Sequence, residues 1–238
     1  MKKRIWELDA LRGLCILGML IVHFVYDLVE LSGLVSWQYP ALFSFVKDWG
    51  GVLFLLISGV CVTLGSHSIR RGFLVFSFGM VCTLVTGILA VTGLADEGIV
   101  IWFGVLHCLG ACMLLWPLFQ KMPVRALAVT GIVLAALGLI LQKYVRVDFP
   151  WLIPLGFLFL GFRSSDYFPL LPHLGFFLLG AVLGKTLYRE KKTLFPKVNE
   201  NTPILRFLQK CGRHSLWIYL LHQPVLAGLM VVLTFFIK

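Results

Sequence analysis

Long apolar runs separated by short polar segments are the main feature of this chain. A helix of about 17–25 apolar residues spans a bilayer, and seven runs of this kind predict spans at 8–29, 50–66, 72–94, 99–119, 124–142, 172–188 and 214–237. A further run, 151–162, is too short to cross as a helix and contains Pro154 and Gly156. We therefore predict an all-α integral membrane protein, a polytopic helical bundle of about seven spans plus a short re-entrant or interfacial segment.

Composition supports a membrane protein with one domain. Apolar residues make up 59% of the 238 residues, charged residues make up 13%, and the mean hydropathy is +0.93. Soluble domains contain roughly 45–50% apolar and about 25% charged residues, so this chain has too little polar surface to cover a soluble fold. The spans and their loops account for the whole length, and we expect a single domain over residues 1–238.

The distribution of Lys and Arg predicts the orientation. If 151–162 does not cross the membrane, 15 of these residues lie on one side and 5 on the other, whereas crossing would give 9 and 11. The positive-inside rule favours the first arrangement, which is a multi-pass protein of the cell (inner) membrane with its N-terminus in the cytoplasm. Although the net charge is +10, no basic stripe alternates with aromatic residues, and we expect no nucleic-acid binding.

The first span carries four ionisable residues on one stripe. Asp9, Arg12, His23 and Asp27 fall within about 60° of one another on a helical wheel. Asp9 and Arg12 are expected near the cytoplasmic end, whereas His23 and Asp27 are expected in the outer half, with roughly 16 Å of helix between Arg12 and His23. Because ionisable groups inside a span are costly, their presence suggests function by default.

This stripe is suited to an elongated anionic molecule lying along the helix. Arg12 offers a planar fork that binds phosphate in a bidentate manner. Asp27, one turn after His23, would orient the imidazole and stabilise its charged form. Ordinary structural interpretations also exist: Asp9 and Arg12 as an ion pair at the membrane interface, and His23 as a polar contact between helices. The common stripe favours the functional interpretation.

Other polar residues are candidates for the same site. His107 and His222 lie deep within their spans, near the level of His23, which suggests a common interior cavity, although each alone is more often a packing histidine. Asp48 and the Asp166–Tyr167 pair are candidates for the substrate side at an outer opening, and placement in ordinary solvated loops explains them equally well. No CxxC, HExxH, Walker or GxSxG motif is present, so we expect no metal site, nucleotide hydrolysis or serine-hydrolase chemistry.

Four segments resemble a known family. They are LDALRGLCILGMLIVHFVYDL (8–28), FGVLH (103–107), SSDYFPLLPHLGFFLLG (164–180) and GRHSLWIYLLHQP (212–224). The first resembles the opening of the transmembrane acyltransferase superfamily, whose bacterial members have an arginine, ten intervening residues and a histidine, as Arg12 and His23 do. The others resemble bacterial relatives of the heparan-α-glucosaminide N-acetyltransferase catalytic domain. That enzyme has asparagine at the His23 position, and its proposed catalytic histidine falls near Leu34.

The resemblance implies acetyl-CoA as acyl donor and acetyl transfer to an acceptor at the outer face. Arg12, anchored by Asp9, would meet the CoA phosphates, while His23, oriented by Asp27, would act as base on a hydroxyl or amine. By the same resemblance, Asp48 matches an acidic residue at the start of the second catalytic-domain helix. His107 or His222 would hold the developing oxyanion.

The expected partners follow from this function. They are the lipid bilayer, acyl-CoA and a glycan or other extracytoplasmic acceptor, and a homodimer remains open. A small proton-coupled transporter using a His–Asp relay is the main alternative, and a non-catalytic membrane scaffold or sensor is a third.

Overall fold

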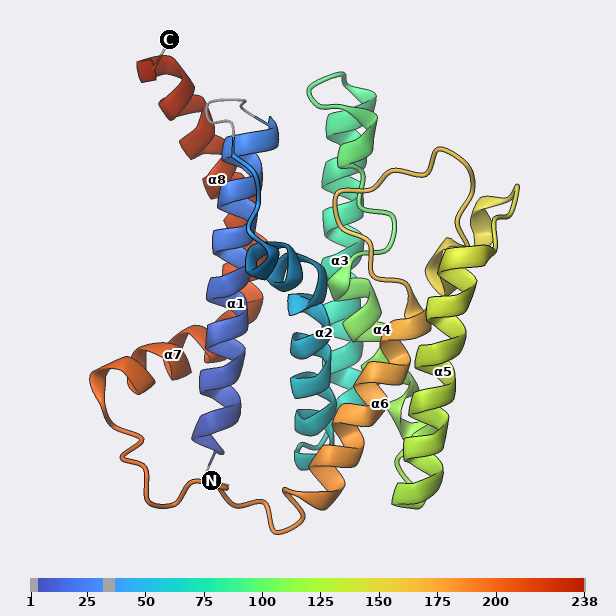
Figure 1. Ribbon diagram of the computed structural model, residues 1–238, viewed down its shortest axis with the longest axis vertical. Helices are drawn as coiled ribbons and strands as arrows, with labels where there is room; N and C mark the ends of the chain where they lie inside the picture. Colours follow the sequence, from blue (N-terminus) through green and yellow to red (C-terminus); the bar gives the residue numbers. More distant parts are fainter. Residues whose placement is uncertain (1–3, 32–36, 238) are drawn as a thin grey trace. The chain divides into compact units, whose positions relative to one another are not determined.

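The computed structural model describes residues 4–31 and 37–237, which are mainly helical (Figure 1). A π-helical turn, η1 (Asp27–Leu31), continues α1, and two short 3-10 turns, η2 (Glu97–Ile99) and η3 (Pro150–Leu155), lie in connections. The longer helices are α1 (Trp6–Tyr26), α2 (Ala41–Leu64), α3 (Ser68–Val91), α4 (Val105–Phe119), α5 (Val124–Tyr144), α6 (Leu170–Thr186), α7 (Pro203–Arg213) and α8 (Ser215–Ile237).

The predicted spans are confirmed as helices, except that the helix within 99–119 begins only at Val105. The segments Trp6–Val29, Ala41–Leu64, Ser68–Val91, Val124–Tyr144 and Ser215–Phe236 are long and apolar enough to cross a membrane, and Val105–Phe119 and Leu170–Thr186 are shorter apolar helices. Residues 151–162 form part of η3 and an irregular connection rather than a helix long enough to span. The chain is thus a polytopic helical membrane protein, in which helices satisfy their own backbone hydrogen bonds.

Two features of the helices were not predicted. α2 begins at Ala41, nine residues before the predicted span, and it continues through the polar residues Lys47 and Asp48. α7 was also missed, since a short segment with basic residues does not stand out as an apolar run. In PILRFLQKCGR the basic residues recur every three to four positions. They therefore lie on one side of a helix, and the apolar residues lie on the other.

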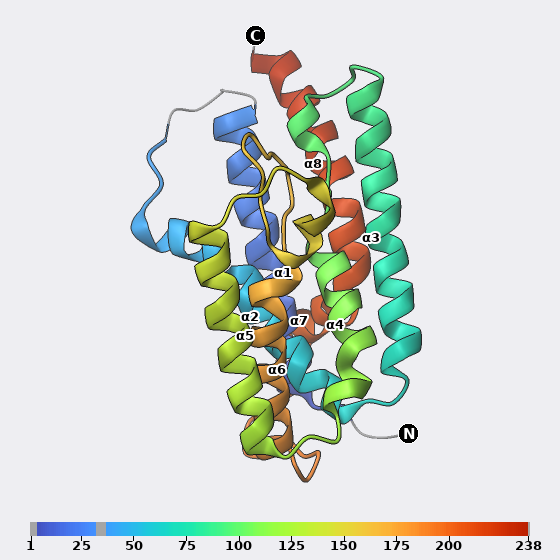
Figure 2. The ribbon, with the colours of Figure 1, turned by 90° about the vertical axis from the view of Figure 1, so that its right-hand side faces the viewer.

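The chain divides into two compact units. The first contains residues 1–54 and 191–238, and the second contains residues 55–190, so α2 passes from one to the other. In the first unit, α7 crosses α1 and α8 runs beside α1 (Figure 1). In the second unit, α3 pairs with α4 and α5 pairs with α6 (Figure 2).

Glycines permit close approach of helices in the second unit. A Cβ at Gly59 would lie 2.0 Å from the carbonyl oxygen of Phe177, and a Cβ at Gly180 would lie 2.1 Å from that of Leu56. These contacts join the C-terminal half of α2 to α6 through their backbones. Small residues have this role in membrane helices, where packing replaces the hydrophobic effect as the force that holds helices together.

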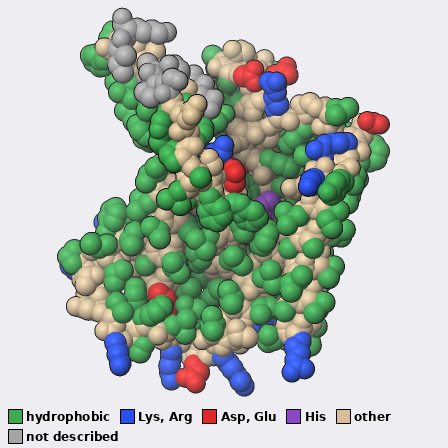
Figure 3. Space-filling view, viewed as in Figure 1, with side chains coloured by type: hydrophobic (Ala, Val, Ile, Leu, Met, Phe, Trp, Pro, Cys, Tyr) green, Lys and Arg blue, Asp and Glu red, His purple; other side chains and the backbone are tan. Residues whose placement is uncertain are grey.

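Exposed side chains between the helix ends are largely apolar. α3 exposes Phe73, Leu84, Ile88 and Val91, among others. Figure 3 shows apolar side chains along the helices, with Lys, Arg, Asp and Glu mainly near helix ends and in connections. This distribution is the one expected of helices whose outer faces contact lipid.

The contact between α2 and α6 is testable with one methyl group. We expect Gly180→Ala to lower the free energy of unfolding by about 1–3 kcal/mol, because its Cβ would overlap the backbone of α2. Thermal unfolding of the purified protein in detergent measures the change. Gly87→Ala in α3 is the matched control, since nothing lies within 4 Å of its Cβ position. Equal melting temperatures for the two variants would contradict this backbone contact between α2 and α6.

Candidate functional site

A buried carboxylate surrounded by arginines lies at the N-terminal end of α1. Asp9 is 5% exposed. Its Oδ1 is 3.8 Å from Nη2 of Arg12, and its Oδ2 is 3.7 Å from both Nη1 of Arg4 and Nε of Arg213. The structure therefore brings the predicted pair, Asp9 and Arg12, together and adds two guanidinium groups to them.

The packing of α7 against α1 places Arg213 at this cluster. A Cβ at Gly13 would lie 2.0 Å from the carbonyl oxygen of Leu208, and a Cβ at Gly212 would lie 1.8 Å from that of Asp9. The two backbones are thus in direct contact. Arg213 follows Gly212, and its Nη2 donates a hydrogen bond of 3.0 Å to Oε1 of Gln209 one turn earlier.

A second buried carboxylate fixes the segment that leads to α7. Glu7 is 4% exposed, and its two carboxylate oxygens accept hydrogen bonds of 2.8 Å from the hydroxyl of Thr193 and the backbone N–H of Leu194. The Gln209 amide in turn donates to the carbonyl oxygen of Glu200 at 2.8 Å. These hydrogen bonds therefore attach the connection before α7 both to α1 and to α7.

Two histidines meet further along α1. The ring centroids of His23 on α1 and His222 on α8 are 4.8 Å apart, with the rings inclined at 73°. The Nδ1 of His222 donates to the backbone carbonyl of Tyr219. That bond fixes the tautomer, because a neutral imidazole with its proton on Nδ1 has its basic lone pair on Nε2.

Asp27 lies beside these histidines but bonds to a different residue. It is 2% exposed in the π-helical turn that continues α1. The Gln223 side chain donates a hydrogen bond to its carboxylate, and no hydrogen bond or ion pair joins Asp27 to His23 among the described residues. Asp27 therefore links α1 to α8 at the residue next to His222, rather than orienting His23 directly.

His107 lies in the second unit, at the N-terminus of α4. Its Nδ1 accepts a hydrogen bond of 3.2 Å from the backbone N–H of Gly104, which leaves Nε2–H to donate to Oγ1 of Thr83 at 3.3 Å. The Thr83 hydroxyl donates onward to the carbonyl oxygen of Ile101 at 2.5 Å. The Nδ1 contact thus stabilises the start of α4, and the Nε2 contact joins α4 to α3.

The predicted substrate-side residues of the second unit also have structural contacts. The Oδ2 of Asp166 accepts a hydrogen bond of 3.0 Å from the backbone N–H of Val105, which satisfies one unpaired donor in the first turn of α4. The Tyr167 hydroxyl donates to the carbonyl oxygen of Ile153 at 2.7 Å, and burial raises the pKa of this phenol, so it remains a neutral donor. Asp48 is exposed on α2, in the first unit.

A cavity common to His23, His107 and His222 stays a prediction. His23 and His222 are in contact within the first unit, whereas His107 belongs to the second. Leu34, near which the catalytic histidine of the heparan enzyme would fall, lies outside the described residues.

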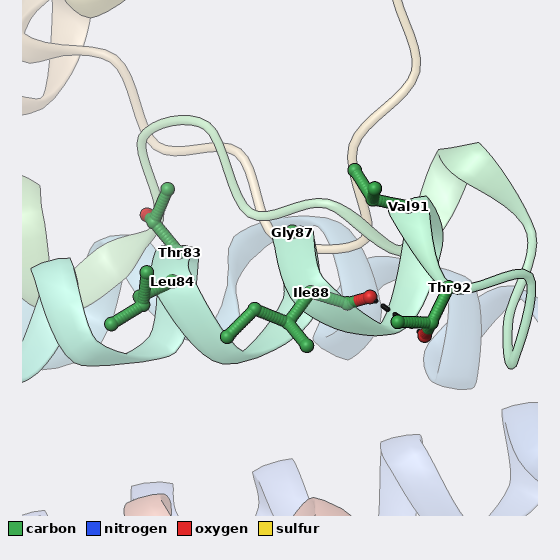
Figure 4. Close-up of a pocket in the computed structure, with 6 residues that line it drawn as sticks. All are labelled: Thr83, Leu84, Gly87, Ile88, Val91 and Thr92. Atoms are coloured by element: carbon green, nitrogen blue, oxygen red, sulfur yellow. Dashed lines mark hydrogen bonds between the residues drawn. The ribbon is translucent and has the colours of Figure 1, made fainter.

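A surface hollow on α3 does not contribute chemistry. It is lined by Thr83, Leu84, Gly87, Ile88, Val91 and Thr92 (Figure 4). The Thr92 hydroxyl donates to the carbonyl oxygen of Ile88 at 2.8 Å, and that of Thr83 donates to Ile101. With both hydroxyls bound to backbone and no charged residue in the lining, the hollow lacks an acid or base.

Sequence reasoning missed three residues of the first unit: Arg4, Arg213 and Gln223. Arg213 and Gln223 lie within a quoted motif, in GRHS and LLHQP, whereas Arg4 lies four positions before the first quoted segment. Their significance depends on which helix they face, which the motifs alone do not indicate.

Asp166 provides a test of the structural role. We expect Asp166→Ala to lower the free energy of unfolding by about 1 kcal/mol, since it removes the acceptor for the α4 N-terminus. Asp166→Asn keeps an acceptor oxygen and should retain most of that stability. Thermal unfolding measures both variants. If Asn were as destabilising as Ala, the hydrogen bond to Val105 would not be the source of the effect.

Comparison with known protein families identifies one match. The family model described as heparan-alpha-glucosaminide N-acetyltransferase, catalytic, matches residues 4–224. No curated protein and no solved structure matches the chain at a significant level. The matched region includes both the arginine cluster and the histidine pair.

Proposed function

The chain belongs to the family of heparan-α-glucosaminide N-acetyltransferase catalytic domains, and on this premise we propose that it transfers an acetyl group from acetyl-CoA. The donor would bind from the cytoplasm, and the acceptor would be a hydroxyl or amine of a sugar-containing molecule at the outer side of the cell membrane. Family membership favours this reaction over the proton-coupled transporter.

One observation carries the proposal: α1 has an arginine cluster at one end and a histidine pair along the same stripe. The separation of 11 positions from Arg12 to His23 corresponds to roughly 16 Å of helix. A CoA thioester has the same order of groups, with phosphates at one end, an extended pantetheine arm, and the reacting carbonyl at the other end. Arg12, anchored by Asp9, would bind phosphate, while His23 would lie near the thioester.

His23 would act as general base. As the acceptor oxygen or nitrogen bonds to the acetyl carbonyl carbon, the imidazole removes the acceptor proton. The carbon–sulfur bond then breaks, and the CoA thiolate takes that proton from the imidazolium. General-base catalysis of this kind typically contributes 10²–10⁴-fold to the rate.

His222 would share the proton with His23. Because Nδ1 of His222 donates to the Tyr219 carbonyl, its Nε2 is the nitrogen that can accept a proton. Two adjacent imidazolium ions repel each other, so the pair would hold one added proton at a time. Once protonated, His222 would also have an Nε2–H to offer the developing oxyanion. Asp27 would position α8 through Gln223.

Removing the His23 imidazole tests its role as base. We expect His23→Ala to lower acetyl-CoA turnover by about 10²–10⁴-fold while leaving donor affinity nearly unchanged. His214→Ala is the control, since this histidine is exposed and its imidazole Nδ1 donates to the backbone carbonyl oxygen of Lys210. Wild-type turnover in His23→Ala would remove His23 from the mechanism.

Donor binding is tested independently of turnover. We expect acetyl-CoA at 100 times its Kd to stabilise the detergent-purified protein by about 2.7 kcal/mol, because a ligand that binds only the folded state raises its stability. The melting temperature measures this, and acetate at the same concentration should leave it unchanged. Arg12→Ala should weaken the acetyl-CoA effect. Equal effects of acetate and acetyl-CoA would contradict a CoA site.

A further inference from the structure

One side of α7 packs against α1 near the N-terminal end of that helix. The backbones of Leu208 and Gly212 are in direct contact with those of Gly13 and Asp9. These two positions of α7 lie about 40° apart on the helix, so a narrow side of α7 makes the contact. The rest of the helix surface is available to other partners.

The contact places α7 where α1 changes from polar to apolar. The first turns of α1 contain the charged residues Glu7, Asp9 and Arg12, whereas residues 13–22 contain none. α8, which is also long and apolar enough to cross a membrane, begins at Ser215, just after α7 ends. α7 lies across α1 and leads into α8 (Figure 1). A helix that lies across spanning helices, at the level where they become apolar, has the position of an interfacial helix.

A second side of α7 exposes large apolar side chains. Ile204 is 75% exposed and Phe207 is 56% exposed. These positions lie within about 60° of each other and roughly 90° from the side that contacts α1. The connection before α7 adds Phe195, which is 52% exposed and whose ring centroid is 6.4 Å from that of Trp6. Apolar area of this kind gains stability when it leaves water.

The third side of α7 is basic. Arg206, Lys210 and Arg213 lie within about 60° of one another, on the other side of the α1 contact from the exposed apolar residues. Arg206 and Lys210 are exposed, and Arg213 pairs with Asp9. Residues 191–213, which include the connection, contain six basic residues and one acidic residue. The charge of this segment is therefore complementary to an anionic partner.

We propose that α7 is an interfacial helix that binds anionic phospholipids of the bilayer. Ile204 and Phe207 enter the region of the acyl chains, while Arg206 and Lys210 lie at the headgroup phosphates. A phospholipid presents phosphate and acyl chain at different depths, which matches the separation of the basic and apolar sides of α7. Each basic residue near an anionic membrane surface strengthens binding by about fivefold.

Other occupants match only one side of the helix. An acidic soluble protein would pair with Arg206 and Lys210 but leave Ile204 and Phe207 in water. A second copy of this chain would cover the apolar side but bring two basic helices together, which charge repulsion disfavours. The bilayer satisfies both sides, and α7 lies between two spans that already fix it there.

The affinity of the full-length protein for two lipids tests the basic side. We would measure the binding of phosphatidylglycerol and of phosphatidylcholine to the protein in uncharged detergent by native mass spectrometry. We expect the tightest site of the wild type to prefer phosphatidylglycerol by about 20-fold, from two basic side chains. The double variant Arg206→Gln/Lys210→Gln should reduce this preference toward one.

A second double variant provides the matched control. Lys121→Gln/Arg125→Gln also removes two exposed basic residues, from the connection before α5 and the first turn of α5. It should keep the wild-type preference, because these residues lie in the second unit. The melting temperature in lipid-free detergent identifies any variant that has lost its fold.

Hydrogen exchange in nanodiscs tests the position of α7 in the wild type itself. We expect the amides of residues 203–213 to exchange more slowly in an equal mixture of phosphatidylcholine and phosphatidylglycerol than in phosphatidylcholine alone. Ile204→Ser/Phe207→Ser should speed exchange of this helix in both compositions, since its contact with the acyl chains is weakened.

Three results would overturn the proposal. They are equal affinity of the wild type for the two lipids, a preference that Arg206→Gln/Lys210→Gln leaves unchanged, and equal exchange of α7 in the two compositions. A dimer that Ile204→Ser/Phe207→Ser dissociates would also overturn it, because a second copy would then cover the apolar side. None of these measurements uses acetyl transfer, so their outcome is independent of the proposed function.

Discussion

A polar group placed inside a membrane protein must find a polar partner within the protein, and this constraint organises the first unit. α1 carries four ionisable residues along one stripe, and three of them have a partner on another element. Asp9 meets Arg213 of α7, His23 meets His222 of α8, and Asp27 bonds to Gln223. The cost of burying these groups is thus the reason that α7 and α8 are held against α1 at defined positions.

The two units use similar residues for different purposes. In the second unit, His107 and Asp166 bind the backbone at the start of α4, so their polar atoms stabilise a helix end. In the first unit, the imidazoles of His23 and His222 face each other, and the arginines surround a single carboxylate. The same types of side chain therefore make different contacts in the two units. The sequence alone did not distinguish these contacts. The chemistry proposed for this protein is therefore assigned to residues along α1.

Prediction from the sequence succeeded where the physical signal is local. Apolar runs long enough to span a bilayer become helices because no alternative satisfies the backbone in lipid, and the stripe on α1 follows from helical periodicity. The short segment at 151–162 was correctly separated from the spans because its length is inadequate. α7 was missed, since a short helix with a basic side does not stand out as an apolar run.

The sequence by itself determined the membrane class, the helices and the alignment of Asp9, Arg12, His23 and Asp27, because these depend on hydropathy and on 3.6 residues per turn. Only the tertiary structure decided which residues complete the site. Arg213 is 204 positions from Asp9, and His222 is 199 positions from His23. Contacts over such separations depend on how helices pack, here through the backbone contact of Gly13 and Gly212, and no local pattern records that packing.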